Sequence, residues 1–251
     1  MSDQYTVLAG FYDELNSKED YEAIRRFAEN VFTLHGIRPG DTLIDIGCGT
    51  GKLTCMLCED GYDMIGCDIS EQMLCQALAR ADDAGVRPFF IRQDMRSLEL
   101  FSPVQGGFCF FDGINYLNDV SELSRTFERI GESLVPGAVF VFDVNSEYRY
   151  ESVYGENTYV YDEKSVFCVW QNFYDAKKRK CDFDLTFFVK NKEGNTYVRK
   201  QEHQVQTCFS HEEVLCAVEG SGFSLLAVYS GPDMSPPSQK AEKRYYVIRK
   251  R

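Results

Sequence analysis

Three glycines at alternate positions, Gly47, Gly49 and Gly51, follow a short apolar run that carries one acid, Asp45. A helical pattern over residues 52–59 comes directly after them. Glycine allows positive φ angles and close approach of a ligand, and the first amides of a helix point toward a negatively charged group. This succession of strand, turn and helix therefore predicts a site for a nucleotide-like ligand above the glycines.

The spacing of the glycines distinguishes between two kinds of nucleotide site. The dinucleotide fingerprint Gly-x-Gly-x-x-Gly would need its third glycine where this chain has Lys52. The pattern acid-x-Gly-x-Gly-x-Gly instead resembles motif I of the class I S-adenosylmethionine-dependent methyltransferases. The resemblance covers residues 1–145 and the chain from residue 210 onward, and it implies S-adenosylmethionine as the cofactor.

Two further acids stand at suitable distances along the chain. Asp68 ends a second strand pattern, and Asp94 follows a third. The resemblance implies that Asp68 pairs with the ribose hydroxyls and that Asp94 with Met95 holds the adenine. Asp68 or Ser70 could instead cap the next helix, and Asp94 could form a surface turn. The cofactor-binding residues that the resemblance implies are Tyr12, Asp45, Gly47, Cys48, Gly49, Asp68, Ile69, Met73, Gln93, Asp94 and Met95.

Asn115 and Tyr116 follow a fourth strand pattern at residues 108–111. Asn-Tyr at this place is typical of a small-molecule branch of the same family. An amide can donate to or accept from an amine or a hydroxyl, and a tyrosine offers a π face and a hydroxyl. We therefore expect both residues to contact the substrate. The alternative is that Asn115 caps a turn and Tyr116 packs in the core.

The segment 5–15 precedes the first strand and contains Tyr5, Phe11, Tyr12 and Asp13. It resembles the N-terminal Tyr-Asp segment that covers the cofactor in small-molecule methyltransferases. Aromatic faces attract a sulfonium by cation–π interaction, and Tyr12 is the better candidate of the two tyrosines for this role. The segment could instead cap the edge of the sheet.

The order of the elements predicts an α/β fold, a doubly wound Rossmann-like methyltransferase sheet of seven strands with its last strand antiparallel. Ser210 and Glu213 form a capping box that restarts helix after a region without helical pattern. We expect a cofactor-binding core at residues 1–144 and 210–251 and an antiparallel β insertion at residues 145–209. The predicted strands are 43–46, 63–68, 89–93, 108–111, 138–143, 223–229 and 244–249 in the core and 166–174, 181–189 and 197–209 in the insertion.

The insertion would lie beside the carboxyl edge of the sheet, where open α/β folds bind their ligands. It is therefore the expected substrate lid. Trp170 and Tyr174 are candidate substrate contacts, although packing within the insertion would also explain them. His203 lies in a polar strand and is a candidate base, with a surface position as the alternative. The candidate catalytic residues are Tyr12, Tyr116 and His203.

Composition limits the partners. The chain has 251 residues, 44% of them hydrophobic, enough for one large core with an elaboration. The net charge of -12 argues against nucleic acid, which is bound mainly through Lys and Arg. No apolar run reaches bilayer length and no leader pattern opens the chain, so we expect a cytoplasmic protein without a membrane partner. A homodimer is left open.

Ten cysteines call for an explanation. Cys55 and Cys58 have a spacing that can begin a zinc site, but no second pair completes it. We therefore expect free thiols that pack as small apolar groups in a reducing compartment, and no metal.

The insertion after the fifth strand resembles amino-sugar N,N-dimethyltransferases and glycine N-methyltransferase-like enzymes. That resemblance implies an amine acceptor, which needs no general base, whereas a hydroxyl acceptor would need one. The leading hypothesis is S-adenosylmethionine-dependent methyl transfer to a small molecule, possibly an amine or amino sugar. The alternatives are a protein or tRNA methyltransferase and a non-catalytic S-adenosylmethionine-binding module.

Overall fold

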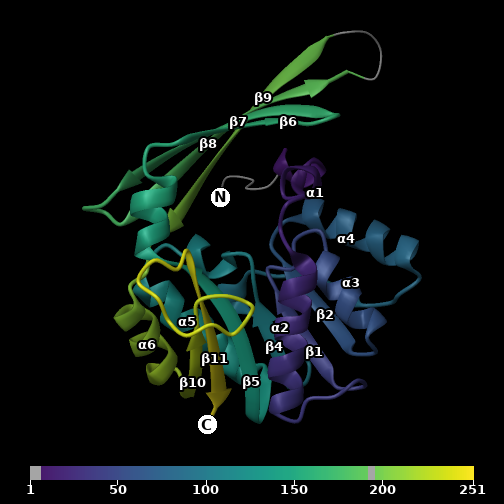
Figure 1. Cartoon of the computed structure of the whole chain (residues 1–251). Coiled ribbons are helices and arrows are strands. Elements are labelled where there is room, and N and C mark those ends of the chain that lie inside the picture. Colours follow the sequence, from purple (N-terminus) through teal and green to yellow (C-terminus); the bar gives the residue numbers. More distant parts are fainter. Residues whose placement is uncertain (1–6, 192–195) are drawn as a thin grey trace.

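A seven-stranded sheet forms the centre of the molecule (Figure 1). The structure is a computed structural model and describes residues 7–191 and 196–251. The strands are β1 (Thr42–Ile46), β2 (Asp63–Asp68), β3 (Phe89–Arg92), β4 (Val104–Cys109), β5 (Leu134–Asn145), β10 (Phe223–Tyr229) and β11 (Lys243–Lys250). Their order is β10-β11-β5-β4-β1-β2-β3, with β1 to β5 parallel and β11 antiparallel to both neighbours. The predicted fold class, including the antiparallel final strand, is confirmed.

Helices cover both faces of this sheet. One apolar cluster joins α2 (Tyr21–Leu34) and α3 (Lys52–Glu59) to one face. A second cluster joins α5 (Val120–Glu132) and α6 (His211–Gly220) to the other face. The helix α4 (Glu71–Ala84) lies beside β2 and β3. These helices form because apolar residues recur at helical spacing on the buried side of each.

Local signals set the starts of these helices. The capping box of Ser210 and Glu213 is present at α6, as predicted. Ser70 caps α4 by accepting a hydrogen bond from the amide of Met73 at 3.3 Å. Asp20 accepts from the amide of Ala23 at the start of α2. Each cap satisfies an amide that the first turn of a helix leaves without an intrahelical partner.

Between β5 and α6 the chain forms a second, antiparallel sheet. It consists of β6 (Thr158–Asp162), β7 (Val166–Asp175), β8 (Lys180–Lys190) and β9 (Tyr197–Thr207), in that order. The three strands predicted here correspond to β7, β8 and β9. The sequence did not predict β6 or the π-helical turn η4 (Arg149–Tyr154). The sequence also predicts a turn at residues 191–194 between β8 and β9, and residues 192–194 of it lie outside the described residues.

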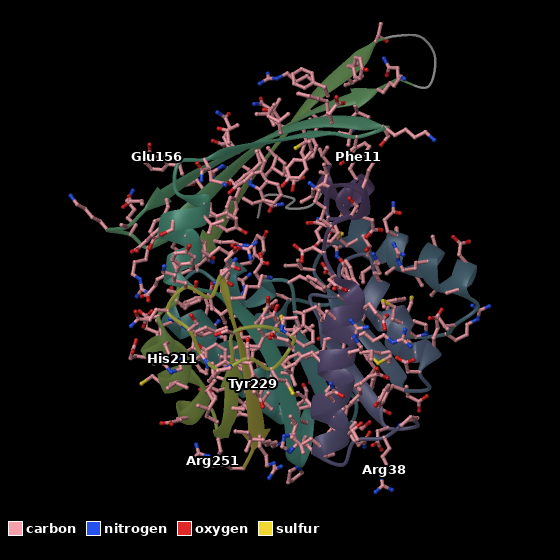
Figure 2. The ribbon with its side chains drawn as sticks, viewed as in Figure 1. Phe11, Arg38, Glu156, His211, Tyr229 and Arg251 are labelled. Atoms are coloured by element: carbon pink, nitrogen blue, oxygen red, sulfur yellow. The ribbon has the colours of Figure 1, made fainter. Side chains whose placement is uncertain are left out.

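The N-terminal elements η1 (Leu8–Gly10) and α1 (Tyr12–Leu15) lie between the second sheet and the core (Figure 1). Phe11, labelled in Figure 2 between the second sheet and the core, stacks on Phe187 of β8 with 6.4 Å between the ring centroids. Asp13 accepts a hydrogen bond from Thr50 Oγ1 in the glycine loop at 2.8 Å. Glu14 accepts from the amide of Ser165, in the turn between β6 and β7 of the second sheet, at 3.1 Å. This segment therefore ties the second sheet to the glycine loop.

The described residues also bear on membrane insertion and metal binding. Across residues 7–191 and 196–251, none of the helices combines the length and the apolar character that a membrane span requires. In the same part of the chain, no three His, Cys, Asp or Glu side chains come together as metal ligands. Cys55 is buried and Cys58 is half-buried, and both are free thiols.

Candidate active site

A cavity of about 460 Å³ opens at the carboxyl ends of β1 to β4. Gly47 and Gly49 line it, and both have left-handed backbone angles, with φ of 71° and 54°. A side chain at Gly49 would have no neighbour within 4 Å, so the missing side chain leaves space in the cavity wall open. A glycine loop that leaves such space suits a ligand that lies directly on the backbone.

Gly51 has a packing role in the same loop. A Cβ atom at Gly51 would lie 2.8 Å from the Cβ atom of Ala77 in α4 and 3.1 Å from the ring of Phe90. Its φ of 69° is also left-handed. The third glycine of the motif is therefore required for packing the start of α3 against α4.

Asp68 stands at the end of β2 and organises the loop opposite. One carboxylate oxygen accepts a hydrogen bond from the amide of Gly49 at 2.9 Å, and the other accepts from the amide of Ser70 at 2.8 Å. Because Ser70 itself caps α4, the alternative role of Asp68 as helix cap is wrong. Burial raises the pKa of Asp68, and these two hydrogen bonds oppose the shift.

Asp94 and Gln93 line the cavity after β3, and each makes local hydrogen bonds, Gln93 with the backbone of Glu99 and Asp94 with Arg96. Asp94 caps the short turn η2 (Met95–Ser97) by accepting from the amide of Arg96 at 2.9 Å, and it also pairs with the guanidinium of Arg96. Burial acts to raise the pKa of Asp94, but the hydrogen bonds and charge of Arg96 lower it overall. Asp94 thus shapes a turn and lines the cavity at the same time.

The residues that the sequence assigned to the cofactor come together here. They reach the cavity from the glycine loop, from the ends of β2 and β3, from α4 and from the N-terminal segment. All eleven line it, namely Tyr12, Asp45, Gly47, Cys48, Gly49, Asp68, Ile69, Met73, Gln93, Asp94 and Met95. Tyr5 lies outside the described residues.

A second cavity of about 230 Å³ lies under the second sheet. Tyr12, Phe111 and Tyr116 line both cavities and so form a shared wall. The hydroxyl of Tyr116 donates to Oε1 of Gln204 on β9 at 2.8 Å, and Trp170 of β7 also lines the second cavity. The second sheet therefore lies directly beside the glycine-loop site.

Three sequence-based assignments are contradicted by position. His203 projects from the exposed face of β9, where its ring contacts Asp182 at 3.2 Å and Asp184 at 2.8 Å, and it lines neither cavity. Successive side chains of a strand point to opposite faces, so the buried Gln204 points inward and His203 points away. His203 is therefore not positioned as a base.

Asn115 and Tyr174 are the other two residues whose predicted roles the structure contradicts. Asn115 is fully buried and lines neither cavity; its amide donates to Thr207 O at 2.9 Å and accepts from the amide of Asn145 at 2.9 Å. Tyr174 stacks on Tyr150 at 5.6 Å and also lines neither cavity. Both residues link packed elements and do not face a substrate.

The sequence analysis missed a charged group beside the shared wall. Lys243 of β11 is buried between Asp112, at 2.9 Å, and Asp143, at 2.7 Å. Gln206 of β9 donates to the other oxygen of Asp112 at 2.6 Å. Burial acts to raise the pKa of Asp112, but the charges of Lys243 and Arg149 lower it overall, so Asp112 is ionised. Asp112 follows β4 just as Asn115 does, so the strand-end argument could have found it.

Known proteins are similar to part of this chain in one comparison and to nearly all of it in two others. A family described as "Methyltransferase domain" matches residues 43–137. A relative from Geobacillus sp. (strain WCH70), whose name specifies a methyltransferase and no acceptor, is 29% identical and covers 98% of this chain and 99% of its own. The crystal structure of an S-adenosylmethionine-dependent methyltransferase from Clostridium acetobutylicum ATCC 824 superposes with a TM-score of 0.87 at 25% identity and 98% coverage of both chains. This chain is an S-adenosylmethionine-dependent methyltransferase.

A structure described as the sugar N-methyltransferase KedS8 from Streptoalloteichus sp. shares the fold, with a TM-score of 0.77 at 21% identity over 96% of this chain and 92% of that one.

The residues of the methyltransferase fit its cofactor, S-adenosylmethionine. The open glycine loop suits the amino-acid part of the cofactor, and the carboxylate of Asp68 suits hydroxyls of a ribose. Tyr12 in the shared wall offers an aromatic face to a sulfonium. The glycine loop, Asp68 and Tyr12 could therefore each hold a different part of S-adenosylmethionine.

We expect Asp45 to make the affinity of the methyltransferase for its cofactor depend on pH. Burial raises the pKa of Asp45 to about 7, against the opposing hydrogen bond from Thr54. The carboxylate form binds cationic groups better than the acid form, so affinity for S-adenosylmethionine should rise as pH increases from 6 to 8. Calorimetry at several pH values measures this. Asp45→Asn should bind more weakly and without this pH dependence; the same pH profile in that variant would contradict the assignment.

Proposed function

We propose that the enzyme methylates an amine nitrogen of a small molecule that binds in the second cavity. The observation that supports this most is the aromatic lining of that cavity beside the shared wall with the cofactor site. Methyl transfer to a neutral amine creates a positive charge on nitrogen, and aromatic faces and nearby carboxylates stabilise such a charge as it develops. The lining includes Tyr12, Tyr116, Tyr154, Tyr161, Trp170 and the carboxylate of Glu19.

The cofactor supplies a methyl group that is already activated by its sulfonium. The remaining task of the protein is to hold the acceptor in line and to exclude water. Val205 of β9 lines the cofactor cavity, so the second sheet would close over the reacting groups. The bond from Tyr116 to Gln204 orients the shared wall relative to this sheet. The fold shared with a sugar N-methyltransferase supports a sugar-like amine as one acceptor class.

Incubation with methyl-labelled S-adenosylmethionine and a panel of small acceptors tests the proposal. The panel pairs each primary amine, amino sugars and amino acids included, with the matching hydroxyl compound. We expect label only on amines, detected by mass spectrometry as a gain of one methyl. Label on the hydroxyl members alone, or only on added protein or tRNA, would refute an amine acceptor.

Tyr116→Phe tests the orientation of the shared wall. Losing the hydroxyl breaks the bond to Gln204, so kcat/KM for the amine acceptor should fall about tenfold, as expected for one hydrogen bond in a site. Affinity for S-adenosylhomocysteine should stay within about twofold, because the ring remains. Tyr197→Phe at the exposed start of β9 is the matched control and should leave both values unchanged. Equal kcat/KM in the two variants would show that the hydroxyl has no such role.

A further inference from the structure

Arg149 places a positive charge in the wall of the second cavity. It is the first residue of η4, which follows β5 after a short connection, and its side chain is only 18% exposed. Its guanidinium lies over the ring of Tyr154, 4.9 Å from the centroid. Burial acts to lower the pKa of Arg149, but Tyr154 and the charge of Asp112 outweigh it, so the guanidinium stays charged.

The protein satisfies this charge incompletely. The carboxylate of Glu242 stands 3.5 Å from Arg149, longer than the usual 2.7–2.9 Å of a charge-assisted hydrogen bond, and that side chain is 51% exposed. Among the described residues, no direct ion pair joins Arg149 to Asp112, whose two oxygens accept from Lys243 and Gln206. Within residues 7–191 and 196–251, the buried Nε of Arg149 has no hydrogen-bond partner.

A second donor, on another residue that lines this cavity, also lacks a hydrogen-bond partner. The indole Nε1 of Trp170 is buried and has no hydrogen-bond partner among the described residues. A buried N–H without an acceptor is destabilising, and a buried cation that is paired only at long distance also costs stability. Two such donors on residues that line one cavity therefore favour a ligand that brings acceptor oxygens and negative charge.

We infer that the amine acceptor carries an oxyanion, a carboxylate or a phosphate group, that binds Arg149 and the indole N–H of Trp170. This inference rests on the proposed function and specifies its substrate as an anionic amine. A guanidinium presents a planar fork of donors that matches the oxygens of either oxyanion. With the oxyanion held at Arg149, the amine end of the molecule extends toward Tyr12 and Tyr116 in the wall shared with the cofactor.

The chain contains a single tryptophan, so the fluorescence of Trp170 reports directly on this subsite. The protein, saturated with S-adenosylhomocysteine, is titrated with inorganic phosphate or with acetate against chloride at constant ionic strength. We expect a saturable change in indole emission with at least one oxyanion, and the stronger of the two identifies the group. No saturable change with either oxyanion would overturn the inference.

Variants connect this signal to Arg149. Arg149→Gln should weaken oxyanion binding at least about tenfold, since charge-assisted hydrogen bonds are lost. Arg149→Lys keeps the positive charge but lacks the planar guanidinium donors, so it should weaken oxyanion binding several-fold. This variant provides the test if Arg149→Gln folds poorly. Arg38→Gln is the matched control, because Arg38 is exposed at the end of the molecule opposite the second sheet (Figure 2). Equal binding in wild type and in folded Arg149→Gln would overturn the assignment.

The acceptor assay separates this inference from the proposed function. Glucosamine and glucosamine 6-phosphate form one pair of amines, and glycinamide and glycine form another. Within a pair that is methylated, the anionic member should have the higher kcat/KM, and Arg149→Gln should remove that preference. Oxyanion binding without methylation of any amine would keep the subsite and refute the amine acceptor. Methylation of neutral amines that Arg149→Gln leaves unchanged would keep the amine acceptor and refute the oxyanion subsite.

Discussion

Replacing Asp68 with alanine is expected to lower the affinity for S-adenosylmethionine about 10- to 150-fold, the effect of losing one charge-assisted hydrogen bond to the ribose. The carboxylate also holds the amides of Gly49 and Ser70, so some stability should be lost with it. Calorimetry gives the affinity, and thermal unfolding gives the stability. Asp63→Ala at the exposed start of β2 is the matched control and should change neither.

A second ligand separates ribose binding from support of the loop. The 2′-deoxy analogue of S-adenosylhomocysteine lacks a hydroxyl that Asp68 would accept from. Wild type should bind the analogue more weakly than the parent compound, whereas Asp68→Ala should bind the two about equally, because the interaction is already gone. A variant that keeps the full preference for the parent compound would assign Asp68 to the loop alone.

Lys243→Met is expected to destabilise the fold by about 3–5 kcal/mol, because it leaves two buried carboxylates, Asp112 and Asp143, without their shared cation. Lys240→Met removes an exposed lysine from the preceding loop and should change stability by less than about 0.5 kcal/mol. Denaturant unfolding measures both variants.

The stability deficit of Lys243→Met should grow with pH. Without Lys243 the pKa of Asp112 rises, and the pKa of Asp143, already raised by burial, rises further. A carboxyl group whose folded pKa exceeds its unfolded value of about 4 costs stability as pH rises through the interval between them. The deficit relative to wild type should therefore be larger at pH 8 than at pH 5. A deficit independent of pH would show that packing, and not charge, accounts for it.

Local patterns in the sequence were enough for the core and for the cofactor side of the site. Alternating apolar residues, glycines and caps such as Ser70 act within a few neighbours, so strands and helices could be assigned from them. The carboxyl ends of parallel strands meet at one edge, so Asp45, Asp68 and Asp94 could be predicted to converge once their strands were recognised. The loop of Gly47, Gly49 and Gly51 selected the methyltransferase pattern over the dinucleotide one.

The acceptor side was decided by contacts between residues far apart in the chain. His203 and Gln204 are neighbours in sequence, yet only the pairing of β9 with β8 determines which one faces the cavity. Gln206 reaches Asp112 across 94 positions, a contact that no local pattern can specify. The edge strand β6 contains no buried residue and exposes Val160, so its sequence lacks the alternation of apolar and polar positions that marks a half-buried strand.

The sequence by itself therefore determined the fold class, the order of the strands along the chain and the convergence of the predicted cofactor residues on one cavity, because these depend on periodicity and on turns. Only the tertiary structure decided which polar side chains line the second cavity. It removed His203 and Asn115 and introduced Arg149, since the direction of a side chain depends on register and on the packing of one sheet over another.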